Sequence, residues 1–314
     1  MLTSVRASRF VVLLLLVAFG AVTAARADAA RRTLNLGGVE REYLVQLPAQ
    51  ATGLQPLVVV LHGGTRPATD IFARGAWAGV ANREGFVLVA PQGIDNQWND
   101  GRKQTISGKV STADDVAFLE AMIAELIARD RVDPARVYLS GASNGGLMTF
   151  RFACERAGVV AGIAPTISKM PVALREACKP ARPVPVVMIA GTADPLMPYE
   201  GAPTGPMANR SRDPMTTVPE TVEFWAQVNG CTLPAAEASM PDLDASDGTT
   251  VTRLEPSACK GAPMLVYRVN GGGHWQPSLS RVEGGGPIVR MLGPQNHDIE
   301  SAELIWSFLK SVRR

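Results

Sequence analysis

One segment of this 314-residue chain, Val137–Cys154, constrains the fold more than any other. It starts as a short apolar run, passes through Gly-Ala-Ser-Asn-Gly at 141–145, and continues as a helical sequence. The order of strand, tight turn with a central serine, and helix is that of a nucleophile elbow. Gly141 and Gly145 keep side chains out of the turn, so a strained backbone is tolerated at Ser143. We therefore expect Ser143 at the end of a strand, in front of helix N–H groups that favour negative charge.

The first 27 residues have the pattern of a signal peptide. Arg6 and Arg9 precede the apolar core Phe10–Phe19, and Ala25-Arg26-Ala27 is an A-x-A cleavage site. The core has ten residues, too few to span a bilayer comfortably, although an uncleaved anchor is the alternative. We expect a secreted or periplasmic chain, 28–314, with no stable membrane anchor after cleavage.

The charge balance points to no polyanionic partner. Three of the 31 basic residues and none of the 29 acidic residues lie in 1–27, which leaves 28 basic and 29 acidic side chains after cleavage. A chain this close to neutrality is not expected to bind nucleic acid or an anionic membrane.

The cysteine count fits an oxidising compartment. An even number of cysteines in the exported part favours two disulfides over four buried free thiols. No C-x-x-C pair or Cys/His cluster suggests a metal site. The cysteines are Cys154, Cys178, Cys231 and Cys259.

The order of the expected elements predicts the fold class. Residues 33–47 alternate around a Gly-Gly turn, as in a β-hairpin. Apolar runs typical of strands buried on both faces alternate with helical patterns, which predicts a mostly parallel, doubly wound sheet in one domain, 28–314. Residues 232–263 are expected to be irregular. The expected later strands are 56–61, 86–90, 137–140, 159–167, 184–190 and 264–269, and the helices are 69–84, 112–128, 219–228 and 300–312.

A serine nucleophile needs a histidine to take its proton during attack. The chain has three histidines, and His274 follows the last expected strand in a glycine-rich segment, where parallel sheets place their sites. We assign His274 as the base. His62 belongs to the Leu61-His-Gly-Gly turn and is expected to be structural, and His297 lies in a polar loop.

The base needs an acid that fixes its tautomer, in the chain order serine, acid, histidine. Asp194, in Gly191-Thr-Ala-Asp-Pro195, follows a buried strand and fits this order, although an Asp-Pro pair is also a common turn. Asp298 comes after His274 and breaks the order. Three further aspartates in the interval, Asp242, Asp244 and Asp247, have no strand to aim them.

The predicted oxyanion hole combines two backbone N–H groups, one from Asn144 and one from the Gly64–Thr65 turn. Trp98 and Trp275 are candidate substrate-binding residues, because either ring could pack against an acyl group. Ordinary core packing explains each tryptophan equally well.

Four motifs, taken together, resemble the secreted polyhydroxybutyrate depolymerase and feruloyl esterase group, a carbohydrate esterase family 1-like group of α/β-hydrolases. They are Leu61-His-Gly-Gly64, Gly141-Ala-Ser-Asn-Gly-Gly146, Gly191-Thr-Ala-Asp194 and Gly271-Gly-Gly-His-Trp275. The resemblance implies an α/β-hydrolase fold and the triad Ser143, Asp194 and His274. It also implies the disulfides Cys154–Cys178 and Cys231–Cys259. The chain departs from the group by a Gly-rich insertion at 281–297.

These features predict an exported serine hydrolase that cleaves carboxylic esters through an acyl-enzyme, without a metal or cofactor. Its substrate would be a small or polymeric ester. An amidase or peptidase with the same triad, such as a poly(aspartic acid) hydrolase, is the first alternative. A basic rim for such a substrate would consist of Arg102, Lys103, Lys109, Arg210 and Arg212. A non-catalytic binding protein on a hydrolase scaffold is the second alternative.

Overall fold

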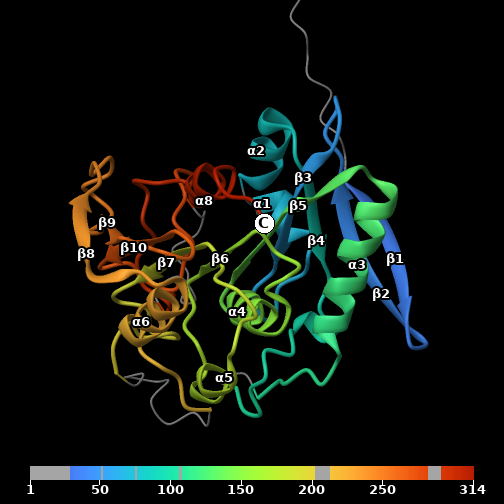
Figure 1. The fold of residues 1–314 in the computed structure, drawn as a ribbon. Helices are drawn as coiled ribbons and strands as arrows, with labels where there is room; N and C mark the ends of the chain where they lie inside the picture. Colours follow the sequence, from blue (N-terminus) through green and yellow to red (C-terminus); the bar gives the residue numbers. More distant parts are fainter. Residues whose placement is uncertain (1–28, 51, 75, 106–107, 202–212, 282–290) are drawn as a thin grey trace, which may run out of the picture.

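The structure, a computed structural model, describes residues 29–50, 52–74, 76–105, 108–201, 213–281 and 291–314. The expected signal peptide, 1–27, therefore lies outside the described residues. Across the described residues runs a ten-stranded sheet, in the order β1-β2-β4-β3-β5-β6-β7-β10-β9-β8 (Figure 1). Its strands are β1 (Ala30–Leu36), β2 (Val39–Gln46), β3 (Gln55–Leu61), β4 (Val87–Pro91), β5 (Val132–Ala142), β6 (Gly162–Thr166), β7 (Val186–Gly191), β8 (Thr232–Ser239), β9 (Thr250–Ser257) and β10 (Met264–Asn270).

The centre of the sheet is parallel, as the apolar runs predicted. Strands β4, β3, β5, β6, β7 and β10 pair in parallel, and each is buried along most or all of its length. Alternate side chains of β3 enter different cores: Val59 belongs to one apolar cluster and Val58 to another. Burial on both faces explains why these strands are continuously apolar.

Helices cover both faces of the sheet (Figure 1). One core contains side chains of α3, α4 and α6, such as Phe118, Phe150 and Trp225. The core on the other face contains side chains of α2 and α8, such as Trp77 and Trp306. The helices are α1 (Asp70–Arg74), α2 (Trp77–Glu84), α3 (Asp115–Arg129), α4 (Asn144–Arg156), α5 (Val172–Ala177), α6 (Val218–Asn229) and α8 (Ser301–Leu309), with a short 3-10 helix at Ile94–Asn96.

Both edges of the sheet are antiparallel. The predicted N-terminal hairpin is confirmed as β1 and β2, with left-handed glycines at the turn, Gly37 and Gly38. The prediction that 232–263 is irregular is wrong, because β8 and β9 pair there and extend the sheet beyond β10. Strand β8 lies at the edge of the sheet and its side chains are mostly exposed. Its sequence therefore lacks the alternation of apolar and polar residues from which a strand is predicted. The helix predicted over 69–84 is also two helices, α1 and α2.

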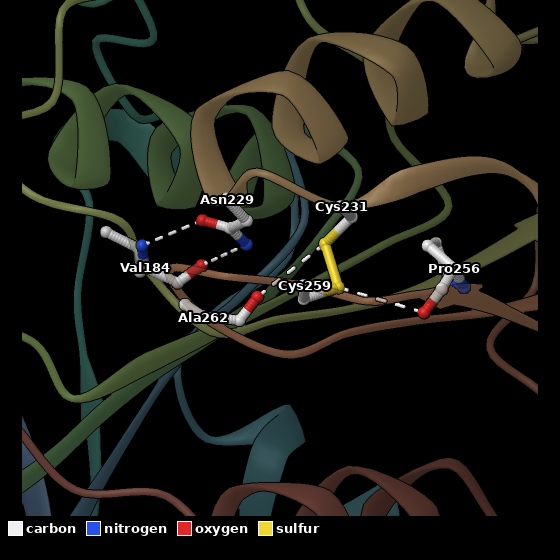
Figure 2. The surroundings of a disulfide bond; sticks show 6 residues. All are labelled: Val184, Asn229, Cys231, Pro256, Cys259 and Ala262. Atoms are coloured by element: carbon white, nitrogen blue, oxygen red, sulfur yellow. Dashed lines mark hydrogen bonds between the residues drawn. A yellow bond between two sulfur atoms is a disulfide. The ribbon is translucent and has the colours of Figure 1, made fainter.

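Two disulfides tie peripheral elements to this core, with the pairing that the family resemblance implied. Cys154 of α4 is joined to Cys178, and Cys231 is joined to Cys259. Figure 2 shows the second bridge beside a polar anchor in which Asn229, at the end of α6, pairs with the backbone of Val184. Two disulfides fit an oxidising compartment. In the described part of the chain, no helix is both long and apolar enough to cross a bilayer.

Candidate active site

Ser143 lies in a sharp turn between β5 and α4, as the elbow motif predicted. Its backbone has φ 53° and ψ −118°, a conformation that is strained for any residue with a side chain. The Ser143 N–H donates to the Thr166 carbonyl at 3.0 Å, which ties the turn to the end of β6. A Cβ at Gly141 would lie 2.3 Å from the Gly145 carbonyl oxygen, and one at Gly145 would lie 2.5 Å from the His62 carbonyl oxygen. Glycine is therefore required at both positions.

Ser143, His274 and Asp194 form a continuous chain of hydrogen bonds. The Ser143 Oγ lies 2.9 Å from His274 Nε2, and the Asp194 Oδ2 lies 2.7 Å from His274 Nδ1. His274 is 8% exposed and Asp194 is 4% exposed. The arrangement fits a neutral imidazole that donates from Nδ1 to the carboxylate and accepts the serine proton at Nε2.

The sheet brings Asp194 and His274 together. Asp194 follows β7 and His274 follows β10, and these strands are parallel neighbours. The second oxygen of Asp194, Oδ1, accepts hydrogen bonds from the N–H groups of Leu196 and Met197, each at 2.8 Å. Both oxygens of the carboxylate are thus engaged, which fixes its orientation.

The described part of the predicted insertion holds the His274 backbone in place; residues 282–290 lie outside the described residues. The His274 N–H donates to the Leu292 carbonyl at 2.6 Å, and the Gly273 N–H donates to the Pro294 carbonyl at 2.7 Å. Trp275 is half-buried, and its Nε1 donates to the Gly293 carbonyl at 3.0 Å. Asp298 was excluded as the acid by its place after His274. Its Oδ1 accepts hydrogen bonds from the backbone N–H groups of Leu243 and Asp244.

Gly64 and Asn144, two of the predicted oxyanion donors, lie in adjacent segments, whereas the N–H of the third, Thr65, is already paired. A Cβ at Gly64 would lie 3.5 Å from the Asn144 Cβ, so the two segments are in contact. Asn144 is the first residue of α4, where an N–H has no partner within the helix. The Thr65 N–H already donates to the Asn96 carbonyl at 2.8 Å. The assignment of Thr65 is therefore wrong, because its donor is used within the loop.

Trp98 is in the core and not in a substrate cleft. It is 2% exposed, its ring lies 4.8 Å from that of His62, and its Nε1 donates to the His62 carbonyl at 2.9 Å. The polar loop that suggested a binding role instead packs its indole inward. His62 has a structural position, as predicted: its Nε2 accepts from the Gly93 N–H at 3.0 Å. Burial lowers the pKa of His62, in keeping with a neutral ring.

Sequence reasoning missed the polar network behind Asn144. The Asn144 Oδ1 accepts from the Trp98 N–H at 2.8 Å, and its Nδ2 donates to the Trp98 carbonyl at 3.0 Å and to Asp100 Oδ2 at 2.6 Å. Asp100 is 3% exposed and also binds the Arg102 guanidinium. The only sequence signal for this network is the polar run Asn96–Asp100, and nothing in that run distinguishes Asp100 as a partner of Asn144.

A second buried ion pair supports the same loop. Arg41 and Asp115 contact at 2.6 Å, and Asp115 Oδ2 also accepts from the Asn99 N–H at 2.6 Å. Asp115 opens α3, so the helix start anchors the loop that reaches Asn144.

Of the predicted basic rim, Lys103 and Lys109 are exposed, but Arg102 is not available. Arg102 is bound to Asp100 with 8% of its side chain exposed, so it is not a surface cation. Arg210 and Arg212 lie outside the described residues. Among the residues that are described, no three His, Cys, Asp or Glu side chains gather as metal ligands.

Comparison with known families agrees with this geometry. The family described as "Esterase PHB depolymerase" matches residues 42–205, more than half of the chain. The chain belongs to the esterase PHB depolymerase family. By this membership it is a carboxylic ester hydrolase.

Individual relatives of this esterase carry related names. NocK of Nocardia uniformis subsp. tsuyamanensis, which is named an esterase, is 31% identical over 81% of this chain and 75% of its own length. Feruloyl esterase B of Piromyces equi is 29% identical over 74% of this chain and 42% of its own length. The matched region thus spans less than half of the second relative.

A solved structure supports the fold. A thermostable esterase aligns with 92% of this esterase and 64% of its own chain, with a TM-score of 0.54 and 17% identity. At that identity the likeness shows the fold alone, which is the α/β-hydrolase fold predicted from the sequence.

Proposed function

We propose that this esterase cleaves carboxylic esters through a covalent acyl-enzyme on Ser143. One observation carries the proposal: Ser143, His274 and Asp194 are linked by contacts of 2.9 and 2.7 Å in a strained elbow. In the first step the Ser143 Oγ attacks the carbonyl carbon while its proton passes to His274 Nε2. The imidazolium that forms is stabilised by Asp194, which stays ionised.

The oxyanion of the tetrahedral intermediate would accept hydrogen bonds from the N–H groups of Asn144 and Gly64. Collapse of the intermediate breaks the bond to the leaving alkoxide, which takes the proton from His274. Water then gives a proton to His274 and attacks the acyl carbon. The ester bond to Ser143 breaks, Ser143 regains its proton, and the carboxylic acid leaves. All of these steps use one base and one oxyanion hole.

We propose small carboxylic esters as substrates in preference to amides. An amide also requires accurate proton delivery to a poor amine leaving group, and no sequence motif besides that of His274 indicates an element for that step. The pairing of Arg102 with Asp100 weakens the case for a poly(aspartic acid) hydrolase. Feruloyl esters and 3-hydroxybutyrate oligomers belong in the test panel because the relatives' names mention feruloyl esters and the family description mentions PHB.

The bond preference is tested with a matched aryl ester and anilide of one acyl group. We expect the ester to have a kcat/KM at least about 10³-fold higher, because the anilide depends on leaving-group protonation. Poly-aspartate is assayed in parallel at low and high salt. Faster cleavage of poly-aspartate than of every ester, suppressed by salt, would contradict the ester assignment.

We further propose export with cleavage after Ala27. The two disulfides support an oxidising destination, and 1–27 has the signal-peptide pattern. N-terminal sequencing of the exported protein should begin at Asp28. Recovery of the whole chain with Met1 in the membrane fraction would contradict cleavage.

A further inference from the structure

Gln276 lies two residues after His274, and the mechanism above does not use it. Its half-buried carboxamide donates from Nε2 to Thr166 Oγ1 at 2.9 Å. Its own carbonyl accepts from Gln295 Nε2 at 3.0 Å. The backbone of Gln276 is thus held on the side of the insertion, while its side chain reaches across to the end of β6.

Thr166, the last residue of β6, binds the elbow at two points. It is fully buried, and its carbonyl accepts from the Ser143 N–H at 3.0 Å. Its Oγ1 donates to the Gly141 carbonyl at 3.1 Å. The hydroxyl therefore gives its one proton to the elbow and uses a lone pair to accept from Gln276. These groups form one chain of hydrogen bonds.

Backbone strain lies on both sides of this contact. Ser143 has φ 53°, and Ile167, directly after Thr166, has φ 43°. A positive φ is a genuine outlier for a β-branched residue. Conformations of this kind persist only where the surrounding contacts over-determine them, and they gather at functional sites. The bonds of Thr166 are among the contacts that hold both turns.

The Gln276 contact differs from the others that hold the segment of His274. The Asp194 carboxylate orients the ring from the loop after β7, and the His274 backbone is bonded to the insertion. Neither of these bonds reaches the elbow. The bond from Gln276 to Thr166 does. It therefore ties the segment of His274 to the turn that carries Ser143, which lies 131 residues away in sequence.

We propose that Gln276 is a positioning residue. Acting through Thr166, it sets the separation between His274 Nε2 and Ser143 Oγ. The proposal rests on the proposed function, in which a proton passes between these two atoms, 2.9 Å apart. Without the Gln276 bond the His274 segment can shift relative to the elbow, and proton transfer requires both groups within hydrogen-bond reach. Because Gln276 acts on the reacting atoms only through this network, its loss lowers kcat and leaves KM nearly unchanged.

The direct test replaces Gln276 with methionine, which has a similar length and no donor. We expect Gln276→Met to lower kcat by about 10-fold to 10²-fold, as for a small misplacement of reacting groups, with KM within about 2-fold of the wild type. The rate constant for inactivation by a fluorophosphonate should fall by a similar factor, because Ser143 is the attacking group in both reactions. The kcat is calculated per site that the fluorophosphonate finally titrates, so that a loss of folded protein is not counted as a loss of kcat.

Thr166 supplies the conservative comparison. Thr166→Val has a similar shape and removes the hydroxyl, so it should lower kcat at least as much as Gln276→Met. Thr166→Ser keeps the hydroxyl and should recover most of the wild-type kcat. The double variant, Gln276→Met with Thr166→Val, should lose no more kcat than Thr166→Val alone, because both changes break the same chain of hydrogen bonds.

Gln46→Met is the matched control for stability. Gln46 is 2% exposed, and its Nε2 donates to Asn82 Oδ1 of α2 at 2.8 Å. This variant should lower the Tm and keep the wild-type kcat.

A wild-type kcat in Gln276→Met would overturn the proposal. Losses that multiply in the double variant, or an equal loss of kcat in Gln46→Met, would overturn it as well. The Ser143→Ala variant separates the two claims. If it is inactive while Gln276→Met is fully active, the triad stands and only the role of Gln276 is wrong.

Discussion

Asn144 Nδ2 donates to Asp100 Oδ2 at 2.6 Å, so a buried carboxylate holds the residue that follows Ser143. Asn144 has two further bonds to Trp98, and all three fix its side chain at the start of α4. Asp100 is in turn bound by Arg102, with both side chains almost fully buried. An ion pair therefore supports Asn144, the proposed oxyanion donor, from behind.

Asp100→Asn should lower kcat by about 10-fold to 10²-fold, because a misplaced oxyanion donor weakens transition-state binding more than substrate binding. The KM should change little. It should also lower the free energy of unfolding by about 1.5–3 kcal/mol, since Arg102 loses a charged partner. Steady-state kinetics and urea unfolding measure the two effects.

Asp133→Asn is the matched control, because Asp133 is a buried aspartate paired with Arg136 at the other end of β5. It should reduce stability while leaving kcat unchanged. Equal losses of kcat in both variants would show that Asp100 acts only through general stability.

Gly145→Ala should abolish esterase activity. Its Cβ would lie 2.5 Å from the His62 carbonyl oxygen and 2.6 Å from that of Leu61, so the elbow or β3 must move. Gly158→Ala is the control, because a Cβ there meets nothing within 4 Å. Soluble expression, circular dichroism and ester hydrolysis are compared for both variants. A fully active Gly145→Ala enzyme would show that the elbow relaxes easily.

Removal of the Cys231–Cys259 bridge by a double change to alanine should lower the free energy of unfolding by about 3–4 kcal/mol in the chain-entropy model. The bridge closes a loop with a sequence separation of 28 and joins the edge hairpin to the end of α6 (Figure 2). The kcat should be retained, because neither cysteine belongs to the triad. Urea unfolding with and without reductant measures the effect, and an unchanged midpoint would contradict it.

His62 should make the fold sensitive to acid. Its folded pKa is lowered by burial from an ordinary value of 6.5. The unfolded chain therefore binds more protons than the folded one below about pH 6.5, and stability falls as the pH decreases through that region. Protonation would also remove the acceptor that Gly93 uses.

His62→Gln, which does not titrate, should show a smaller fall in unfolding free energy between pH 7 and pH 5 than the wild type. Urea unfolding at several pH values gives the two slopes. Parallel slopes would mean that other groups carry the acid sensitivity.

Much of this architecture was predictable because local sequence and topology agree. The apolar runs identified the parallel strands, and the glycines around Ser143 are required by close backbone contacts. Asp194 and His274 follow neighbouring parallel strands, so their positions at strand ends implied that they meet.

The errors occurred where long-range contacts decide. The edge strand β8 has exposed side chains and so gave no alternating pattern. Trp98 is bound to Asn144, which lies 46 residues away in sequence. The Thr65 N–H is bound to Asn96, which is likewise far away in sequence. No periodicity encodes that contact, and the same holds for the bond from Asp100 to Asn144.

The most direct test of the central claim is the site of covalent labelling by a fluorophosphonate, measured by intact mass and peptide mapping. The account predicts one adduct per wild-type chain, located on Ser143, with loss of activity in proportion to labelling. Ser143→Ala should take up no label and lose about 10⁴–10⁶-fold in kcat, with an unchanged circular dichroism spectrum. A folded Ser143→Ala variant that keeps wild-type activity, or a label on any other residue that parallels inactivation, would contradict the account.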